Sequence, residues 1–257
     1  MTAPRTLVVD VGNTTVFAGV FSGTRLVKRF RLTAKAARQP ATWTRLIASR
    51  TTGSLQGAAL SSVVPALTPI IARTLSKAFA LTPAVIAAAA PPGLKIGYRR
   101  PADLGTDRIA CALGARVLFP RRHVIVVDCG TATTVTALHR NGTILGGAIL
   151  PGVGLWPEML ATRTAQLPRL ALRRPRRALG RSPGEALQSG FFFGHAGAIR
   201  ELVGRVRAEA FGRAPVVVIG TGGHATRFAR ENLFTVHEPD LILTGLHAFA
   251  AQIFAHA

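Results

Sequence analysis

Two short apolar runs, one in each half of the chain, stand out in the hydrophobic pattern. Residues 7–9 are Leu-Val-Val and residues 125–127 are Ile-Val-Val, and an aspartate follows each run directly. Runs of β-branched residues bounded by turn signals are typical of buried strands. Each run continues through Asp-x-Gly, a tight turn, into a second apolar segment. The pattern therefore predicts a strand, a hairpin and a second strand in each half.

These two segments form an internal repeat. Asp10 aligns with Asp128 at an offset of 118 residues, which is near half the chain length. A repeat on this scale indicates two similar domains, because solenoid repeats have periods of about 20–50 residues. We expect an α/β fold with one domain over residues 1–119 and a second over residues 120–257.

The remaining segments alternate between strand and helix patterns in both halves. Helices are expected over residues 42–49, 68–79, 107–117, 156–160, 183–210 with a break near Gly190, 226–231 and 241–253. Further strands are expected over residues 14–21, 58–64, 133–138, 144–149 and 216–219, with a hairpin turn at Asn141-Gly142.

Composition narrows the class of protein. Hydrophobic residues make up 48% of the 257 residues, which excludes a disordered chain, and two cysteines exclude a disulfide scaffold. Residues 80–90 are the most apolar stretch, but they span about half a membrane and contain Pro83. No secretory signal follows the first strand, so we expect a cytoplasmic protein without a membrane partner.

The net charge of +21 raises the question of a nucleic-acid partner. However, 28 of the 32 cations are arginine, which a GC-rich coding sequence also produces, and most of them are scattered. The one dense cluster runs from Arg163 to Arg181. We interpret it as a solvated basic loop, with a polyanion or nucleotide-phosphate contact as the alternative.

The two hairpins have the composition of a phosphate site. In residues 10–15, Asp-Val-Gly-Asn-Thr-Thr, Gly12 permits close approach of a phosphate, and backbone N–H groups and threonine hydroxyls can donate to its oxygens. The Asp10 carboxylate suits Mg²⁺. Residues 128–133, Asp-Cys-Gly-Thr-Ala-Thr, repeat this layout, and residues 218–223 add a strand with a glycine-rich turn. This set resembles the actin- and hexokinase-like ATPase superfamily, which implies ATP in a cleft between two ribonuclease-H-like domains.

Gly105-Thr106-Asp107-Arg108 lies between the two hairpins in sequence. An Asp-Arg pair at the start of a helix commonly serves as a cap and a surface ion pair. At the expected position of an acceptor substrate, Asp107 is instead a candidate general base and Arg108 a candidate binder of carboxylate or phosphate. His195 and Cys129 are interpreted as packing residues, and the Cys and His spacing indicates no zinc site.

Together with Gly146-Gly147-x-Ile149-x-Pro151-Gly152, these motifs resemble the type III pantothenate kinase family from about residue 6 to residue 250. The resemblance implies roles at matching positions. Asp107 would be the catalytic base, and Asp128 would bind a monovalent cation, K⁺ or NH₄⁺, needed beside Mg²⁺. The residues implied to contact ATP are Asp10, Val11, Gly12, Asn13, Thr14, Thr15, Val16, Phe17 and Thr131. Those implied to contact pantothenate are Tyr98, Gly105, Thr106, Asp107, Arg108 and Ser182.

Two of these positions depart from the family pattern. Thr106 stands where the family usually has alanine, and Ser182 where it has threonine. The resemblance also implies a homodimer, with the pantothenate pocket completed at its interface. The expected function is ATP-dependent phosphorylation of pantothenate, the first step of coenzyme A synthesis. A polyanion- or DNA-binding transcriptional accessory protein on the same fold is the alternative, and a kinase for another small hydroxy acid or sugar is a third.

Overall fold

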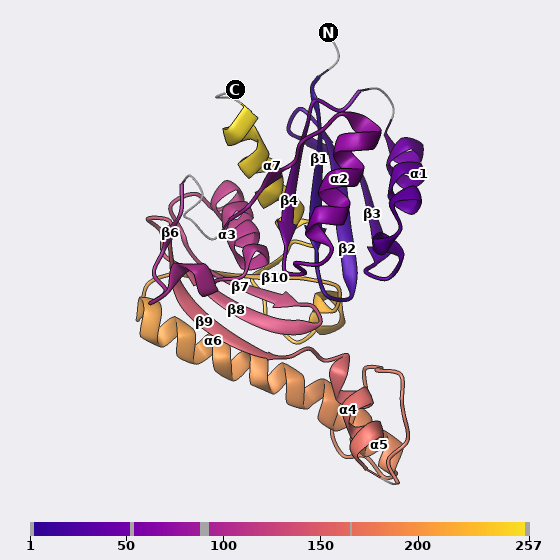
Figure 1. The fold of residues 1–257 in the computed structure, drawn as a ribbon. Helices are drawn as coiled ribbons and strands as arrows, with labels where there is room; N and C mark the ends of the chain where they lie inside the picture. Colours follow the sequence, from indigo (N-terminus) through magenta and orange to yellow (C-terminus); the bar gives the residue numbers. More distant parts are fainter. Residues whose placement is uncertain (1–2, 52–53, 88–92, 165, 255–257) are drawn as a thin grey trace. The chain divides into compact units, whose positions relative to one another are not determined.

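The protein is described here from a computed structural model, which covers residues 3–51, 54–87, 93–164 and 166–254 (Figure 1). Its contacts divide the chain into two compact units. The first extends to Pro120 and resumes at Asp240, and the second is Arg121–Pro239. The C-terminal helix therefore belongs to the first unit, whereas the sequence repeat placed it in the second domain.

The first unit is built on a five-stranded sheet with the order β3-β2-β1-β4-β5. β2 is antiparallel to both β1 and β3. β4 runs parallel to β1, and β5 runs parallel to β4. The bounds are Arg5–Val11 (β1), Thr15–Ser22 (β2), Arg25–Thr33 (β3), Gly57–Ser62 (β4) and Ala84–Val85 (β5). A two-residue strand, β6, covers Lys95–Ile96.

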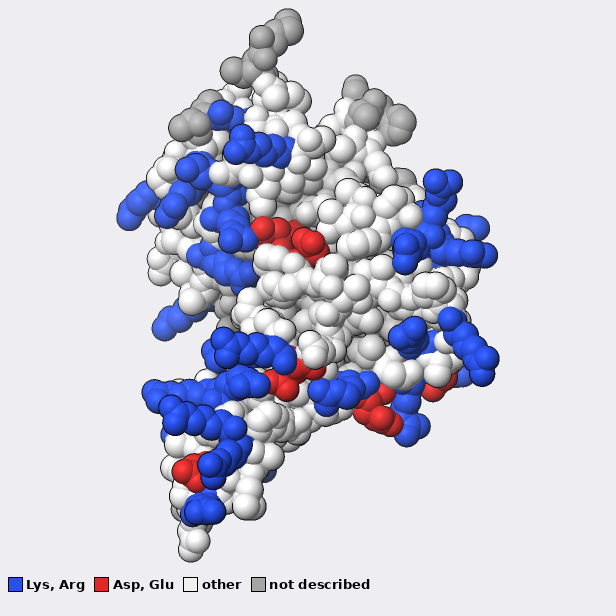
Figure 2. All heavy atoms as spheres, turned by 180° about the vertical axis from the view of Figure 1, so that it is seen from behind, with Lys and Arg blue, Asp and Glu red and all other residues white. Residues whose placement is uncertain are grey.

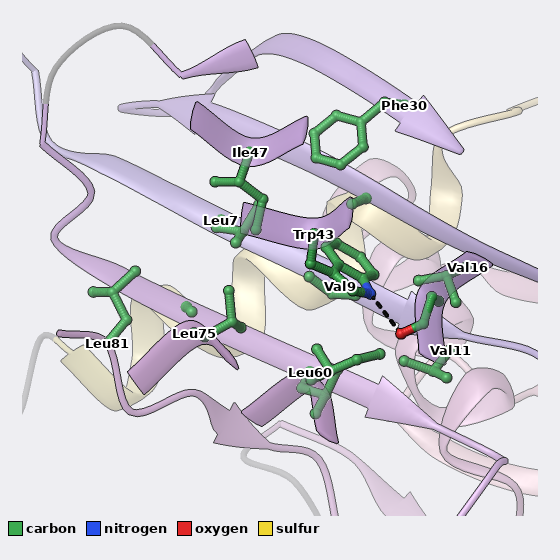
Figure 3. Close-up of a cluster of buried hydrophobic side chains, with 14 of the residues drawn as sticks. Leu7, Val9, Val11, Val16, Phe30, Trp43, Ile47, Leu60, Leu75 and Leu81 are labelled. Atoms are coloured by element: carbon green, nitrogen blue, oxygen red, sulfur yellow. Dashed lines mark hydrogen bonds between the residues drawn. The ribbon is translucent and has the colours of Figure 1, made fainter. Parts of the chain in front are cut away.

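Helices cover both faces of this sheet, which explains why β1 is apolar without alternation. The helices are α1 (Pro40–Arg50), α2 (Thr68–Phe79), α3 (Thr106–Leu118) and α7 (Leu241–Phe254). α7 packs against β1, β4 and α3. On the other face, Leu7, Val9 and Val11 join the α1 and α2 side chains in one buried cluster (Figure 3). The Trp43 indole N–H in this cluster donates to the carbonyl oxygen of Ala37 at 3.1 Å.

The second unit repeats this topology. Its strands follow the order β11-β10-β7-β8-β9, with β7, β8 and β9 antiparallel in succession and β10 and β11 added in parallel. The bounds are His123–Cys129 (β7), Ala132–Leu138 (β8), Thr143–Pro151 (β9), Val216–Thr221 (β10) and Val236–His237 (β11). Both units thus have a ribonuclease-H-like strand order, and the predicted fold class is confirmed.

A segment of about forty residues, which we call the arm, joins β9 to the long helix of the second unit. It contains α4 (Leu155–Arg163), a loop, α5 (Pro183–Ser189) and a π-helical turn (Gly190–Gly194) that leads into α6 (His195–Phe211). In Figure 1, α4 and α5 lie beyond one end of α6. The predicted helical break near Gly190 is confirmed as this turn.

Two sequence expectations differ from the structure. No strand was expected over residues 25–33, where β3 carries four cations on an edge of the sheet. Instead of a helix over residues 226–231, the chain forms a short 3-10 turn at Ala225–Phe228. Part of the apolar stretch 80–90 lies outside the described residues. No helix in the described ranges has the length and apolar character needed to cross a membrane.

Candidate functional site

The first hairpin presents only its tip to solvent. Asp10 pairs with Phe17 and Val11 with Val16, which leaves the four residues 12–15 as the loop. The Gly12 N–H donates to the Thr15 carbonyl at 3.0 Å, while Asn13 and Thr14 are exposed. The side chains of Val11, Val16 and Phe17 are buried in the unit. Of the predicted ATP-binding residues, these three can therefore offer a ligand their backbone but not their side chains.

The second hairpin has the same register but a shorter loop. Asp128 pairs with Thr134 and Cys129 with Thr133, which leaves the three residues 130–132 as the loop. The Gly130 N–H donates to the Ala132 carbonyl at 3.0 Å, and Thr131 is exposed at the tip. The motif repeat is therefore real in three dimensions, although the second turn lacks one residue.

Two other glycine motifs pack directly on the second hairpin. A Cβ at Gly152 would overlap the carbonyl oxygens of Gly130 and Thr131, and its N–H donates to Thr131 at 2.9 Å. Gly222 has φ = +87°, and a Cβ there would overlap the Asp128 carboxylate. The glycine-rich turn after β10 thus closes against Asp128, and only glycine fits at both contacts.

In the first unit, the helix that carries Asp107 is anchored at the same sheet edge as the first hairpin. Ser61 on β4 lies beside Asp10 on β1. The Thr106 hydroxyl lies 3.2 Å from the Ser61 hydroxyl, accepts from the Ser62 N–H at 3.2 Å and lies 3.0 Å from the Ser62 carbonyl. The hydroxyl that departs from the family pattern therefore ties the start of α3 to the end of β4. The sequence pattern does not predict that Ser61 and Ser62 contact Thr106.

Asp107 lies at the start of α3, and its side chain is partly buried. One of its carboxylate oxygens accepts the Arg108 N–H at 2.8 Å. Burial raises the pKa of this carboxyl, although the backbone N–H and the Arg108 charge act in the opposite direction. A raised pKa increases the basicity of the ionised carboxylate toward a substrate proton.

Arg108 and Tyr98 form a fixed pair beside Asp107. Arg108 is buried, and its guanidinium donates to the Tyr98 hydroxyl oxygen. The guanidinium carbon also lies 5.5 Å from the centre of the Tyr98 ring. The structure therefore brings together the predicted residues Tyr98, Gly105, Thr106, Asp107 and Arg108 in one unit.

Ser182 lies in the arm of the second unit and has a structural partner. It is the N-cap of α5, where its hydroxyl oxygen accepts the Glu185 N–H at 3.3 Å. The Glu185 carboxylate in turn accepts the N–H of Arg181, the residue before the cap, at 2.7 Å. The predicted Ser182 hydroxyl is therefore part of a helix cap.

His195 contacts the second hairpin at Thr133. The imidazole is fully buried, and its Nε2 lies 3.0 Å from the Thr133 hydroxyl, two residues after Thr131. Burial, with a smaller effect of His224, lowers the pKa of His195 to about 4, so the ring is neutral. Cys129 is also buried, and burial with the adjacent Asp128 charge raises its thiol pKa to about 12. Both residues pack as the sequence indicated.

The duplicated ribonuclease-H-like sheet, with an Asp-Gly hairpin in each unit, defines the actin-like ATPase fold. Solved structures with this fold include a Campylobacter jejuni protein assigned to the Baf family of transcriptional activators. It has a TM-score of 0.60 and 18% identity and covers 98% of this chain and 100% of that chain. Another is the activator of 2-hydroxyisocaproyl-CoA dehydratase from Clostridium difficile with bound ADPNP. It has a TM-score of 0.54 and 13% identity, and the match covers 98% of this chain and 95% of that chain.

Sequence similarity shows the family. The family description type III pantothenate kinase matches residues 6–205. The type III pantothenate kinase of Legionella pneumophila is 36% identical over 249 residues, which span 95% of this chain and 97% of that protein. The chain belongs to the type III pantothenate kinase family. The family and the fold imply ATP with an associated divalent metal.

Proposed function

We propose that this protein transfers the γ-phosphoryl group of ATP to the hydroxyl of pantothenate, with Asp107 as the base. The single observation that carries the assignment is the cluster at the start of α3. It combines a partly buried carboxylate of raised pKa with a guanidinium fixed by Tyr98. A carboxylate that accepts a proton and a guanidinium that binds an anion are the two groups this acceptor requires, since pantothenate has both a hydroxyl and a carboxylate.

Asp107 accepts the hydroxyl proton while the new oxygen–phosphorus bond forms. Proton acceptance by a positioned side chain contributes about 10²–10⁴-fold to a rate. The Arg108 N–H holds one carboxylate oxygen at 2.8 Å, which fixes the direction in which the other oxygen points. Phosphoryl transfer depends mainly on positioning and electrostatic stabilisation, so this orientation is the residue's second contribution.

Arg108 binds the pantothenate carboxylate, and Tyr98 orients it. Because the guanidinium donates to the Tyr98 oxygen, the phenolic O–H is left to donate to the substrate. A guanidinium recognises a carboxylate best in a bidentate arrangement, which requires a fixed plane. We assign Gly105 and Thr106 to the same pocket through their backbone, because the Thr106 hydroxyl is bonded to β4.

The two hairpins bind ATP through residues 10–17 and Thr131. Their exposed tips carry Asn13, Thr14 and Thr131, whose side chains and N–H groups can donate to phosphate oxygens. Mg²⁺ fits the carboxylate of Asp10, and K⁺ or NH₄⁺ fits Asp128. Both carboxylates offer hard oxygen ligands, and the missing side chain at Gly222 keeps a Cβ off the Asp128 carboxylate. When bound, these cations neutralise phosphate charge.

The arm supports the proposal of a homodimer whose interface completes the pantothenate pocket near Ser182. Exposed apolar side chains occur in and beside it, with Ile149 66% and Met159 47% exposed. Apolar surface of this kind marks interaction sites when it is contiguous. Light scattering of the purified protein tests the proposal, and a monomer at micromolar concentration contradicts it.

The activity is tested by ADP release with pantothenate and a panel of other alcohols, each with and without K⁺ in the presence of Mg²⁺. The proposal predicts turnover with pantothenate that depends on the monovalent cation. Turnover with a different hydroxy acid or sugar, and none with pantothenate, would replace the substrate and keep the kinase. A steep salt dependence of tight, specific DNA binding without ADP release would favour the transcriptional alternative.

A further inference from the structure

The arm carries an open hollow of about 810 Å³. Its lining, between Arg169 and Gln188, includes none of the residues assigned above to ATP or pantothenate. Five arginines line it, and we call the feature the arginine hollow. They are Arg169, Arg173, Arg176, Arg177 and Arg181. Figure 2 shows Lys and Arg atoms crowded over the projecting segment at the lower left, with little acidic surface between them.

Side-chain hydrogen bonds connect the loop that lines the hollow to α5. Gln188 on α5 accepts the Arg173 N–H at 2.8 Å and donates to the Ala171 carbonyl at 2.7 Å. The Ser189 hydroxyl donates to the Ala178 carbonyl. The loop between α4 and α5 is therefore bonded to α5 at two separate points, and the hollow is part of a built structure.

The loop is also attached to the body of the second unit. Arg174 pairs with Glu231 at 2.9 Å and lies 5.7 Å from the centre of the Phe192 ring. Arg227 donates to the Leu172 carbonyl at 3.1 Å. Residues 172 and 174 thus bond to the body, while Arg173 between them lines the hollow.

The hollow has an excess of positive charge that the protein does not balance. Glu185 is the one carboxylate in its lining, and it already accepts the Arg181 N–H. Within the ranges that the structure describes, none of the five arginines has a salt bridge to a carboxylate. Exposed guanidinium groups that line one space and have no salt bridge to a carboxylate are suited to bind anions, above all phosphate.

We propose that the arginine hollow binds a small molecule with two or more phosphoryl groups. Its volume lies within the range of about 300–1,000 Å³ typical of small-molecule sites. An extended nucleic acid would instead require a basic stripe along the surface. A single carboxylate would engage only one or two of the five guanidinium groups, whereas linked phosphoryl groups can engage several at once. Because the arginines are exposed, binding weakens as ionic strength rises.

Titration calorimetry with inorganic tripolyphosphate tests the proposal on the full-length protein. The nucleotide site is first filled with a non-hydrolysable ATP analogue, so that the probe reports on a second site. The test variant is Arg176→Gln with Arg177→Gln. The control is Arg207→Gln with Arg213→Gln, which removes the same charge from exposed positions outside the hollow.

We expect one tripolyphosphate per chain in the parent and the control, and at least tenfold weaker binding in the test variant. Equal weakening in both variants would show a bulk charge effect and overturn the proposal. A single-stranded oligonucleotide that displaces the probe and depends on the same two arginines would overturn it in favour of a nucleic-acid surface. ADP release with pantothenate is measured in parallel, and its absence would count against the proposed kinase reaction alone.

Discussion

His195 makes the stability of the second unit depend on pH. The ring is fully buried, and its pKa falls from 6.5 to about 4, chiefly through burial and to a smaller extent through His224. Above pH 6.5 the ring is neutral in both the folded and the unfolded chain. Below that pH the unfolded chain binds the proton first, so the free energy of unfolding decreases until the folded ring titrates near pH 4.

The size of the effect follows from the two pKa values. A difference between 6.5 and about 4 corresponds to about 3 kcal/mol over the whole window, since one pKa unit is about 1.4 kcal/mol. Between pH 7 and pH 5 the folded ring stays neutral and the unfolded ring becomes charged. The expected loss from His195 over that interval is about 2 kcal/mol.

The chain offers a local fluorescent reporter for this loss. Trp156 lies 6.2 Å from His195 between ring centres, and the other tryptophan, Trp43, belongs to the first unit. In a Trp43→Phe background, urea unfolding followed by Trp156 fluorescence reports on the second unit. The matched variant is His195→Gln, which has no titratable ring and keeps an amide group within reach of the Thr133 hydroxyl.

We expect the parent to lose about 2 kcal/mol more than His195→Gln between pH 7 and pH 5. Other titrating groups, including His224, are present in both proteins and cancel in the comparison. If the two proteins lose the same free energy within about 0.5 kcal/mol, the reasoning that His195 is held neutral by burial is refuted.

Three further substitutions test the site. Thr106→Ala removes the hydroxyl that bonds to Ser61 and Ser62. Urea melts should show that the free energy of unfolding of the first unit falls by about 1–3 kcal/mol. Thr106→Ser keeps the hydroxyl and should retain most of that stability. Gly222→Ala places a Cβ against the Asp128 carboxylate at φ = +87° and should reduce kcat/KM for ATP at least tenfold; unchanged kinetics would contradict that contact. Tyr98→Phe leaves the guanidinium without its oxygen partner and should raise KM for pantothenate about tenfold at an unchanged KM for ATP; equal effects on both substrates would argue against a local role.

The sequence contained the repeat in a form that predicted the fold. Asp10 and Asp128 each follow a buried strand, and the strand orders of the two units agree as the repeat required. The β3 strand was missed because it is an edge strand, where solvated cations replace the apolar pattern of a buried strand. The C-terminal helix has an apolar pattern that shows only that it is buried, and the pattern does not say against which sheet.

For the site, composition and spacing predicted which residues carry chemistry but not what holds them. The contact of Thr106 with Ser61 and Ser62 joins residues some 44 positions apart, and no local pattern predicts it. The closure of Gly222 on Asp128 is likewise a long-range contact. Raised basicity at Asp107 depends on burial, which only the folded unit provides.

The most direct test of the central claim is the turnover of Asp107→Asn in an ADP-release assay with pantothenate. The control is Asp103→Asn, which removes an exposed carboxylate four residues earlier that pairs with Arg100. If Asp107 is the base, its variant loses at least about 10²-fold in kcat with little change in KM for ATP, while the control keeps parental turnover. Near-parental kcat in Asp107→Asn would contradict the account.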